Sequence, residues 1–171
     1  MAVLVCVSAI VCLLVYNSLK ATEEASVADM ADGNAAVEYN IEHCGDDIFE
    51  ATMSTVENGN QKFISYKGNG SQYLRIKGWA YRPGEDIKTA DSAFMLREPG
   101  TDKYIKLKTV MEKRQDVTDK FGENQYSYNL SGLVSIVKKS DLKPGVTYDV
   151  YIAYGNDGSN LLVNTFTKLQ A

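Results

Sequence analysis

Turn signals interrupt this chain so often that few folds remain open to it. Every proline is followed by a glycine, at Pro83-Gly84, Pro99-Gly100 and Pro144-Gly145. This pair suits a type II turn, because proline sets φ at the second position and glycine accepts the positive φ at the third. Further breaks occur at Asn58-Gly59, Gly68-Asn69-Gly70 and Gly155-Asn156-Asp157-Gly158. The segments between these breaks are too short for long helices.

Apolar and polar residues alternate between the turns, which is the pattern of half-buried strands. The expected strands are 48–56, 62–66, 73–81, 92–97, 104–111, 126–137, 146–154 and 161–169. One short helical turn is expected at 117–121. Seven or eight strands at this spacing are typical of an antiparallel sandwich. The sequence therefore predicts a mainly β domain over 48–171.

The first nineteen residues carry no charge. At about 1.5 Å per residue they approach the roughly 20 residues that cross a bilayer core. A cleaved signal peptide would need a basic start and small residues at positions −3 and −1. Here nothing basic precedes the apolar run, and cleavage after Ala21 would place Leu19 at −3. We therefore expect 1–19 to be one uncleaved transmembrane helix, whose orientation the flanking charges do not decide.

Charge is unevenly distributed around a net value of −4. Residues 21–50 contain acids and no Lys or Arg, whereas bases exceed acids from residue 51 onward. We expect 20–47 to be a solvated acidic stalk, of which 21–31 could continue the first helix. The acidic balance argues against a dedicated nucleic-acid binder.

Residues that support catalysis or metal binding are scarce. Cys6 and Cys12 lie in the apolar run, so Cys44 has no partner for an intradomain disulfide. It adjoins His43, the only histidine, but neighbouring side chains on an extended segment point apart. A Ser-His-Asp arrangement in the domain is therefore not available. We expect no enzyme, no cofactor and no metal, although the Asn156-Asp157 oxygens leave a calcium site open.

The segment Leu142-x-Pro144-Gly145-x-x-Tyr148 resembles the corner between two strands of fibronectin type III and related immunoglobulin-like domains. The Pro-Gly pair turns the chain, Leu142 packs inward, and the Tyr148 hydroxyl reaches back to a backbone group. The resemblance implies an immunoglobulin-like or fibronectin type III-like sandwich in which Tyr148 is structural. The 68 residues between Trp79 and Tyr148 exceed the usual spacing. Extra strands or a long hairpin around 91–121 would absorb the difference.

Further short motifs cover more of the domain: Ile76-Lys77-Gly78-Trp79-Ala80, Arg114-Gln115-Asp116-Val117 and Ser131-Gly132-Leu133. With the Pro-Gly-x-x-Tyr strand, they resemble an extracytoplasmic β-sandwich domain of bacterial cell-envelope proteins from Gram-positive surface-polysaccharide systems. The resemblance implies an accessory domain outside the membrane, with no catalytic residues to transfer.

One candidate binding surface lies on 73–81. Tyr73, Arg75, Lys77, Trp79 and Tyr81 share one face of this strand, and the smaller or aliphatic residues share the other. If the aliphatic face is the core, the aromatic and cationic strip faces outward and can stack on sugar rings or hold an anionic glycan. Alternatively, a bulge at Gly78 turns Trp79 inward as a core anchor.

A second candidate surface is a basic stripe, in which Tyr104, Lys106 and Lys108 alternate with apolar residues and Lys113 and Arg114 follow. It would attract anionic wall polymer or lipid headgroups. It is alternatively a solvated sheet face, or the acidic stalk folds back and neutralises it. Arg114 and Asp116 are expected to form an ion pair at the start of the helical turn.

These features predict a single-pass cell-membrane protein, tethered through 1–19, whose extracytoplasmic sandwich is a non-catalytic accessory module. Its expected partner is an anionic envelope polysaccharide, another glycan or a surface protein. The alternative is a structural subunit of a surface assembly. Pilin-like proteins also join an apolar N-terminal helix to a β-rich head, but their processing motif is absent from this sequence.

Overall fold

A computed structural model describes residues 23–46, 50–57, 60–67, 72–89 and 91–171 of the protein. The strands are β1 (Glu23–Ala25), β2 (Ala31–Asp32), β3 (Glu38–Asp46), β4 (Glu50–Glu57), β5 (Asn60–Lys67), β6 (Tyr73–Tyr81), β7 (Ala93–Arg97), β8 (Tyr104–Lys106), β9 (Thr109–Glu112), β10 (Gly132–Lys138), β11 (Thr147–Asn156) and β12 (Ser159–Gln170). The helical segments are α2 (Gln115–Phe121) and a 3₁₀ turn, η1 (Lys139–Asp141). The mainly β prediction is therefore confirmed.

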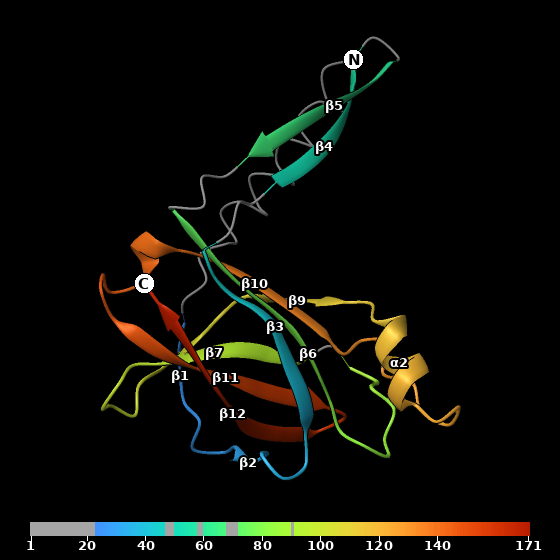
Figure 1. Ribbon diagram of the computed structural model, residues 1–171, viewed down its shortest axis with the longest axis vertical. Helices are drawn as coiled ribbons and strands as arrows, with labels where there is room; N and C mark the ends of the chain where they lie inside the picture. The colour runs from blue at the N-terminus through green and yellow to red at the C-terminus, as the bar shows by residue number, and fades with distance from the viewer. Residues whose placement is uncertain (1–22, 47–49, 58–59, 68–71, 90) are drawn as a thin grey trace.

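Two sheets form a sandwich (Figure 1). Sheet A has the strand order β1-β8-β7-β11-β12-β2, and sheet B has the order β3-β6-β10-β9. Neighbouring strands are antiparallel in both sheets, apart from the short parallel pair of β2 and β12. Strands β4 and β5 pair with each other as a separate hairpin between β3 and β6.

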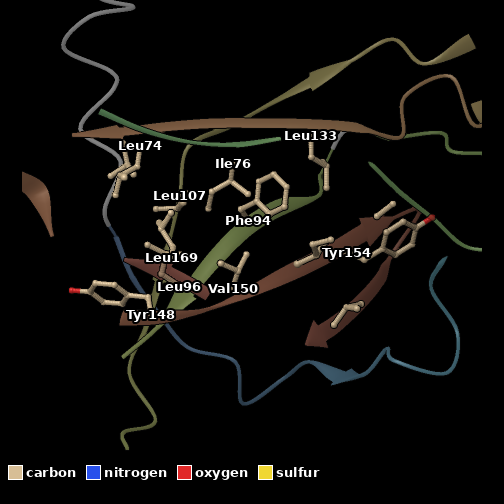
Figure 2. Close-up of a cluster of buried hydrophobic side chains, with 14 of the residues drawn as sticks. Leu74, Ile76, Phe94, Leu96, Leu107, Leu133, Tyr148, Val150, Tyr154 and Leu169 are labelled. Carbon is tan, nitrogen blue, oxygen red and sulfur yellow. The ribbon is translucent and has the colours of Figure 1, made fainter. Parts of the chain in front are cut away.

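The core lies between the sheets and is made by alternate residues of their strands. In β6, Leu74 and Ile76 are almost fully buried, whereas Lys77, which faces the other side of the same strand, is only partly buried. Sheet A contributes Phe94, Val150 and other side chains that point toward those of sheet B (Figure 2). The period of two in the sequence therefore separates the inner and outer faces of the sheets.

The corner before β11 has the expected geometry. The Tyr148 ring is 1% exposed, and its hydroxyl accepts a hydrogen bond from the Lys143 backbone N–H at 3.0 Å. Leu142 is buried in the same core, and Gly145 has φ of 73°, which favours glycine. The hydroxyl thus holds the turn that leads into the central strand of sheet A.

The expected strand over 104–111 is divided between the sheets. Strand β8 belongs to sheet A and β9 to sheet B, with Leu107 buried in the core where the chain crosses. Thr109 holds the crossing, because its Oγ1 accepts the Phe94 N–H and lies 2.8 Å from Ser135 Oγ. This crossing breaks the alternation on which a continuous basic stripe over 104–111 depended.

The prediction of a solvated stalk over 20–47 is wrong for residues 23–46, the part of this range that the structure describes. Strand β3 pairs with β6, and the preceding segment crosses the outer face of sheet A. We call residues 23–32 the strap: Val27 and Met30 pack against Met95, Tyr104 and Tyr151 on that face. The sequence prediction failed because the many acids indicated a fully solvated segment, although they occupy only the exposed positions and apolar residues lie between them. The described sandwich therefore includes residues 23–46, which precede the boundary expected at 48.

The expected anchor over 1–19 lies outside the described residues. Among the residues that are described, no helix combines the length and the apolar character that crossing a bilayer requires.

The position of β3 predicts how truncation affects stability. A fragment of 23–171 should unfold in one cooperative transition, followed by circular dichroism in urea. A fragment of 51–171 should be much less stable or lack that transition, because it loses a full neighbour of β6 and the buried Val37. Equal midpoints for the two fragments would contradict this account.

The corner predicts two separable effects at Tyr148. Tyr148→Phe should keep the fold and lose a hydrogen bond worth about 0.5–1.5 kcal/mol. Tyr148→Ala should cost about 3–5 kcal/mol, because it also opens a cavity in the core. Urea unfolding of fragment 23–171 measures both changes, and equal stability of the three proteins would contradict a structural role.

Candidate functional site

The outer face of sheet B carries the most developed cluster of aromatic and charged side chains in the described structure. A row of paired residues crosses all four strands here: Asn40 on β3, Trp79 on β6, Gly132 on β10 and Glu112 on β9. Residues in one such row project on the same face. Gly132 contributes no side chain to this row, and a Cβ at its position would lie only 2.8 Å from Arg114 Cγ. The Arg114 side chain therefore lies over this glycine.

Trp79 belongs to an aromatic cluster at the end of β6. Its ring centroid is 5.7 Å from that of Tyr81 and 5.5 Å from that of Phe121, and the Tyr81 and Tyr128 rings stack at 4.2 Å. Tyr81 and Tyr128 are buried, while Trp79, Phe121 and Tyr126 are half-buried around them. The cluster is a second small core with a partly exposed aromatic border.

Helix α2 and the loop after β6 hold this cluster against the sheet. Val117 of α2 packs among the aromatic rings. Thr118 Oγ1 accepts the Tyr128 N–H at 2.9 Å, and the Tyr128 hydroxyl accepts the Gly84 N–H at 3.2 Å. The loop is further held by Asn156, whose side-chain oxygen accepts the Lys88 N–H at 2.8 Å. Turns far apart in the sequence therefore converge on one end of the sandwich.

Arg114 connects α2 to the opposite edge of sheet B. Its Nε and Nη2 donate to the two Asp116 carboxylate oxygens at 2.8 and 2.7 Å. Nη2 also lies 2.8 Å from Glu42 Oε1 on β3. The expected Arg114–Asp116 pair is thus present, with Glu42 as an acid that the sequence did not indicate. This geometry makes Arg114 a bridge within the protein, since only 14% of its side chain is exposed.

The ion pairs shift the pKa values of their members. Hydrogen bonds from Arg114 lower the pKa of Asp116 to about 2, from an ordinary value of 3.8. The same bonds raise the pKa of Arg114. Elsewhere at this end of the sandwich, burial and then the nearby Glu85 raise the pKa of Tyr154 to about 12. These groups keep a single charge state around neutral pH.

Of the two alternatives for 73–81, the structure has the outward-facing strip, but this strip is not a uniform exposed surface. The pairing of β6 with β10 is continuous through Gly78, so no bulge in β6 turns Trp79 into the central core. The irregularity lies in β3, between Ile41 and His43. Tyr81 is nonetheless buried beneath the aromatic cluster, and Tyr73 lies at the far end of the strand, opposite Lys138.

The second predicted surface is dispersed. Tyr104 is 7% exposed beneath the strap, on the outer face of sheet A. Lys106 on β8 is exposed and lies directly opposite Glu23 of the strap. Lys108 is exposed at the crossing between sheets, and Lys113 is exposed before α2. The predicted binding residues are therefore spread over the outer faces of both sheets and the connections between them, and they do not form one site.

The site also includes aromatic residues that sequence reasoning missed. Phe121, Tyr126 and Tyr128 surround Trp79 and Tyr81, although 126–137 was expected to be one continuous strand. The alternation of Tyr126 and Tyr128 was visible in the sequence, but in the structure these two residues lie outside the strands, between α2 and β10. Only the tertiary fold shows that this segment turns back over the end of β6.

The His43–Cys44 pair does not have the character of a reactive site. Burial raises the pKa of the Cys44 thiol to about 11, so the thiolate is scarce at neutral pH. The Cys44 sulfur lies 3.6 Å from the Lys168 carbonyl oxygen, to which its S–H donates. Across the described ranges, no group of three or more His, Cys, Asp or Glu side chains is arranged to hold a metal.

The shifted pKa of Asp116 predicts an acid-sensitive contribution to stability. Its folded pKa lies below its unfolded value, so the contribution is complete above about pH 4. It is lost as the pH falls toward about 2. Asp116→Asn should destabilise the fold at pH 7 and reduce the further loss of stability between pH 4 and 2, measured by urea unfolding of fragment 23–171. Asp119→Asn is the matched control, since Asp119 bonds the neutral Gln115 side chain. Parallel pH profiles for Asp116→Asn and the unsubstituted fragment would contradict the assignment.

Comparison of the chain with protein families, curated proteins and solved structures gave no match. Its function is therefore inferred from the geometry of the described residues.

Proposed function

We propose that this chain is a membrane-tethered, extracytoplasmic binding module of the bacterial cell envelope. Its ligand would be an envelope glycan held without catalysis on the outer face of sheet B. The observation that carries this proposal is the half-buried Trp79 at the border of a rigid aromatic cluster. A ring held in place by its neighbours offers a stacking surface with little loss of conformational entropy on binding.

Polar groups around Trp79 suit the hydroxyl groups of a sugar. Asn40 is exposed on β3 directly opposite Trp79. On the other side, Lys77 Nζ lies 2.9 Å from Glu112 Oε2, and both side chains are partly exposed. Amide, ammonium and carboxylate groups beside an aromatic ring provide donors and acceptors together with an apolar surface.

The strand order supports an immunoglobulin-like relationship for the sandwich. If β3, β6, β7, β8, β9, β10, β11 and β12 are assigned as strands A, B, C, C′, D, E, F and G, sheet B has the order A-B-E-D and sheet A contains C′-C-F-G. This is the arrangement of the immunoglobulin fold, with β4 and β5 inserted between A and B. The Tyr148 hydrogen bond falls near the start of strand F, as in a tyrosine corner.

Because residues 23–25 already belong to the sandwich, the proposed tether is shorter than the stalk expected from the sequence. With strand β1 beginning at Glu23, only three residues separate it from the expected anchor over 1–19. A tether of that length holds the domain beside the membrane surface rather than on a stalk above it. The proposed ligand is therefore a glycan close to the bilayer.

A structural subunit of a surface assembly is the second candidate. The described structure exposes two large apolar side chains on different sheets: Val110 on β9 is 61% exposed and Phe166 on β12 is 79% exposed. Phe166 also has a φ of 54°, which is unfavourable for a bulky residue. Apolar contacts on separate edges favour head-to-tail association between copies.

The glycan proposal predicts a specific effect at Trp79. Fragment 23–171 should bind one class of envelope glycan on an array, and Trp79→Ala should reduce that binding about tenfold or more, as expected for loss of a 1.4 kcal/mol stacking contact. Trp79→Phe should retain part of the binding, because an aromatic face remains.

Phe166→Ala is the matched control, since it removes an exposed aromatic ring from the other sheet. It should leave glycan binding unchanged. Thermal unfolding of each variant separates lost binding from lost folding. Unchanged binding by folded Trp79→Ala would exclude this surface, and self-association abolished by Phe166→Ala would favour the structural subunit.

A further inference from the structure

The strap, residues 23–32, occupies a surface that a second chain can also fill. We propose that the outer face of sheet A and the edge of β8 form an acceptor site for an extended acidic strand, and that the strap of a second copy of this protein is its partner. In one chain the strap fills the site from within. Two copies that exchange straps would form a dimer through the contacts already present in the monomer. This face is separate from Trp79, so the inference does not depend on the proposed glycan binding.

The backbone of the strap is bound as an added strand. Its first end pairs antiparallel with β8, through Glu23–Lys106, Glu24–Ile105 and Ala25–Tyr104. Its other end pairs parallel with β12, through Ala31–Leu161 and Asp32–Leu162. Addition of a strand to an exposed sheet edge is a common mode of peptide recognition, because backbone groups provide the pairing.

The inward side chains of the strap show what the site accepts. Ala25, Val27 and Met30 pack against a buried patch on sheet A that includes Tyr104 and Tyr151. The two tyrosine rings meet edge to face at 5.3 Å. Removal of the strap would expose this patch to water, and contiguous apolar patches are unfavourable on soluble domains. The site therefore selects a strand with small or flexible apolar residues on one side.

The outward side chains add a charge preference. Glu23 and Lys106 lie directly opposite each other on neighbouring strands, where opposite charges are favourable and like charges are not. Glu24, Asp29 and Asp32 are also exposed on the strap. Arg97 is the register partner of Tyr104, and its guanidinium carbon lies 5.9 Å from the Tyr104 ring centroid. A second copy provides this same pattern of acids and apolar residues.

Few interactions hold the strap in its own chain. Five residue pairs join it to the two sheet edges. A turn follows, in which the Ala36 and Val37 N–H groups donate to the Gly33 carbonyl oxygen. Elements with so little pairing open at lower cost than central strands. The short connection through this turn gives the internal strap an effective concentration on the order of 1 mM, which a second copy must approach.

Disulfide trapping between two different preparations tests the exchange. Both are full chains in detergent with Cys6→Ser, Cys12→Ser and Cys44→Ser; one carries Glu23→Cys and the other Lys106→Cys. Because residues 23 and 106 are register partners, their mixed disulfide forms when the strap of one copy lies on β8 of the other. The product is identified by mass spectrometry after oxidation of the mixed preparations.

The matched control is a mixture of Asp149→Cys and Lys168→Cys chains in the same background. These oppositely charged residues are also register partners, but they belong to the central hairpin of β11 and β12. Exchange of that hairpin requires most of sheet A to open, so this mixture measures random collisions and any association through other parts of the chain.

We expect abundant mixed disulfide for the 23/106 pair at about 1 mM chain, with roughly tenfold less at about 0.1 mM, and only background for the control. A single chain carrying both Glu23→Cys and Lys106→Cys should instead give an internal disulfide when dilute. A 23/106 yield no higher than the control would overturn the exchange. Failure of the internal disulfide to form would overturn the position of the strap itself.

Discussion

Leu74 and Ile76 of β6 share one buried core with Val150 and Ile152 of β11, and the remaining elements depend on this contact between the sheets. Each strand is central in its sheet, with neighbours on both sides. Because alternate residues face inward, the same strands also determine what lies outside. Trp79 is presented on the outer face of sheet B and Tyr151 on the outer face of sheet A. The two proposed binding surfaces therefore lie on the two outer faces of the same sandwich.

The two outer faces are covered in different ways. Helix α2 and the turns around it cover one end of sheet B and leave Trp79 at the border of an aromatic cluster. The strap covers the patch on sheet A with a few apolar residues and two very short strands. The first cover is held by hydrogen bonds to Thr118 and Tyr128, and by the Arg114 ion pairs. The strap is held to the sheet edges by few residue pairs, and exchange between copies is therefore proposed for the strap alone.

The comparison between sequence and structure is most informative for the acidic segment. Its many carboxylates suggested a solvated stalk, yet β3 completes sheet B and Val37 enters the core. Exposed acids on an edge strand are compatible with partial burial of the residues that alternate with them, so overall charge is a poor guide to a strand's location. For the predicted binding residues, the sequence left open whether Trp79 faces outward or turns into the core, and the unbroken pairing of β6 with β10 places it on the outer face. The sequence could not indicate that Tyr81 and Tyr104 would be buried beneath segments remote in the chain.

The alternation of residues and the Pro-Gly turns by themselves determined the mainly β fold and the corner at Tyr148, because these features depend on local backbone geometry and period. Only the tertiary structure decided which segments cover the two outer faces. It joined Glu42 to Arg114, placed Tyr128 on Tyr81 and laid the strap across Tyr104. Such contacts arise from how distant segments pack, and a residue's type and its immediate neighbours carry little information about a partner many residues away.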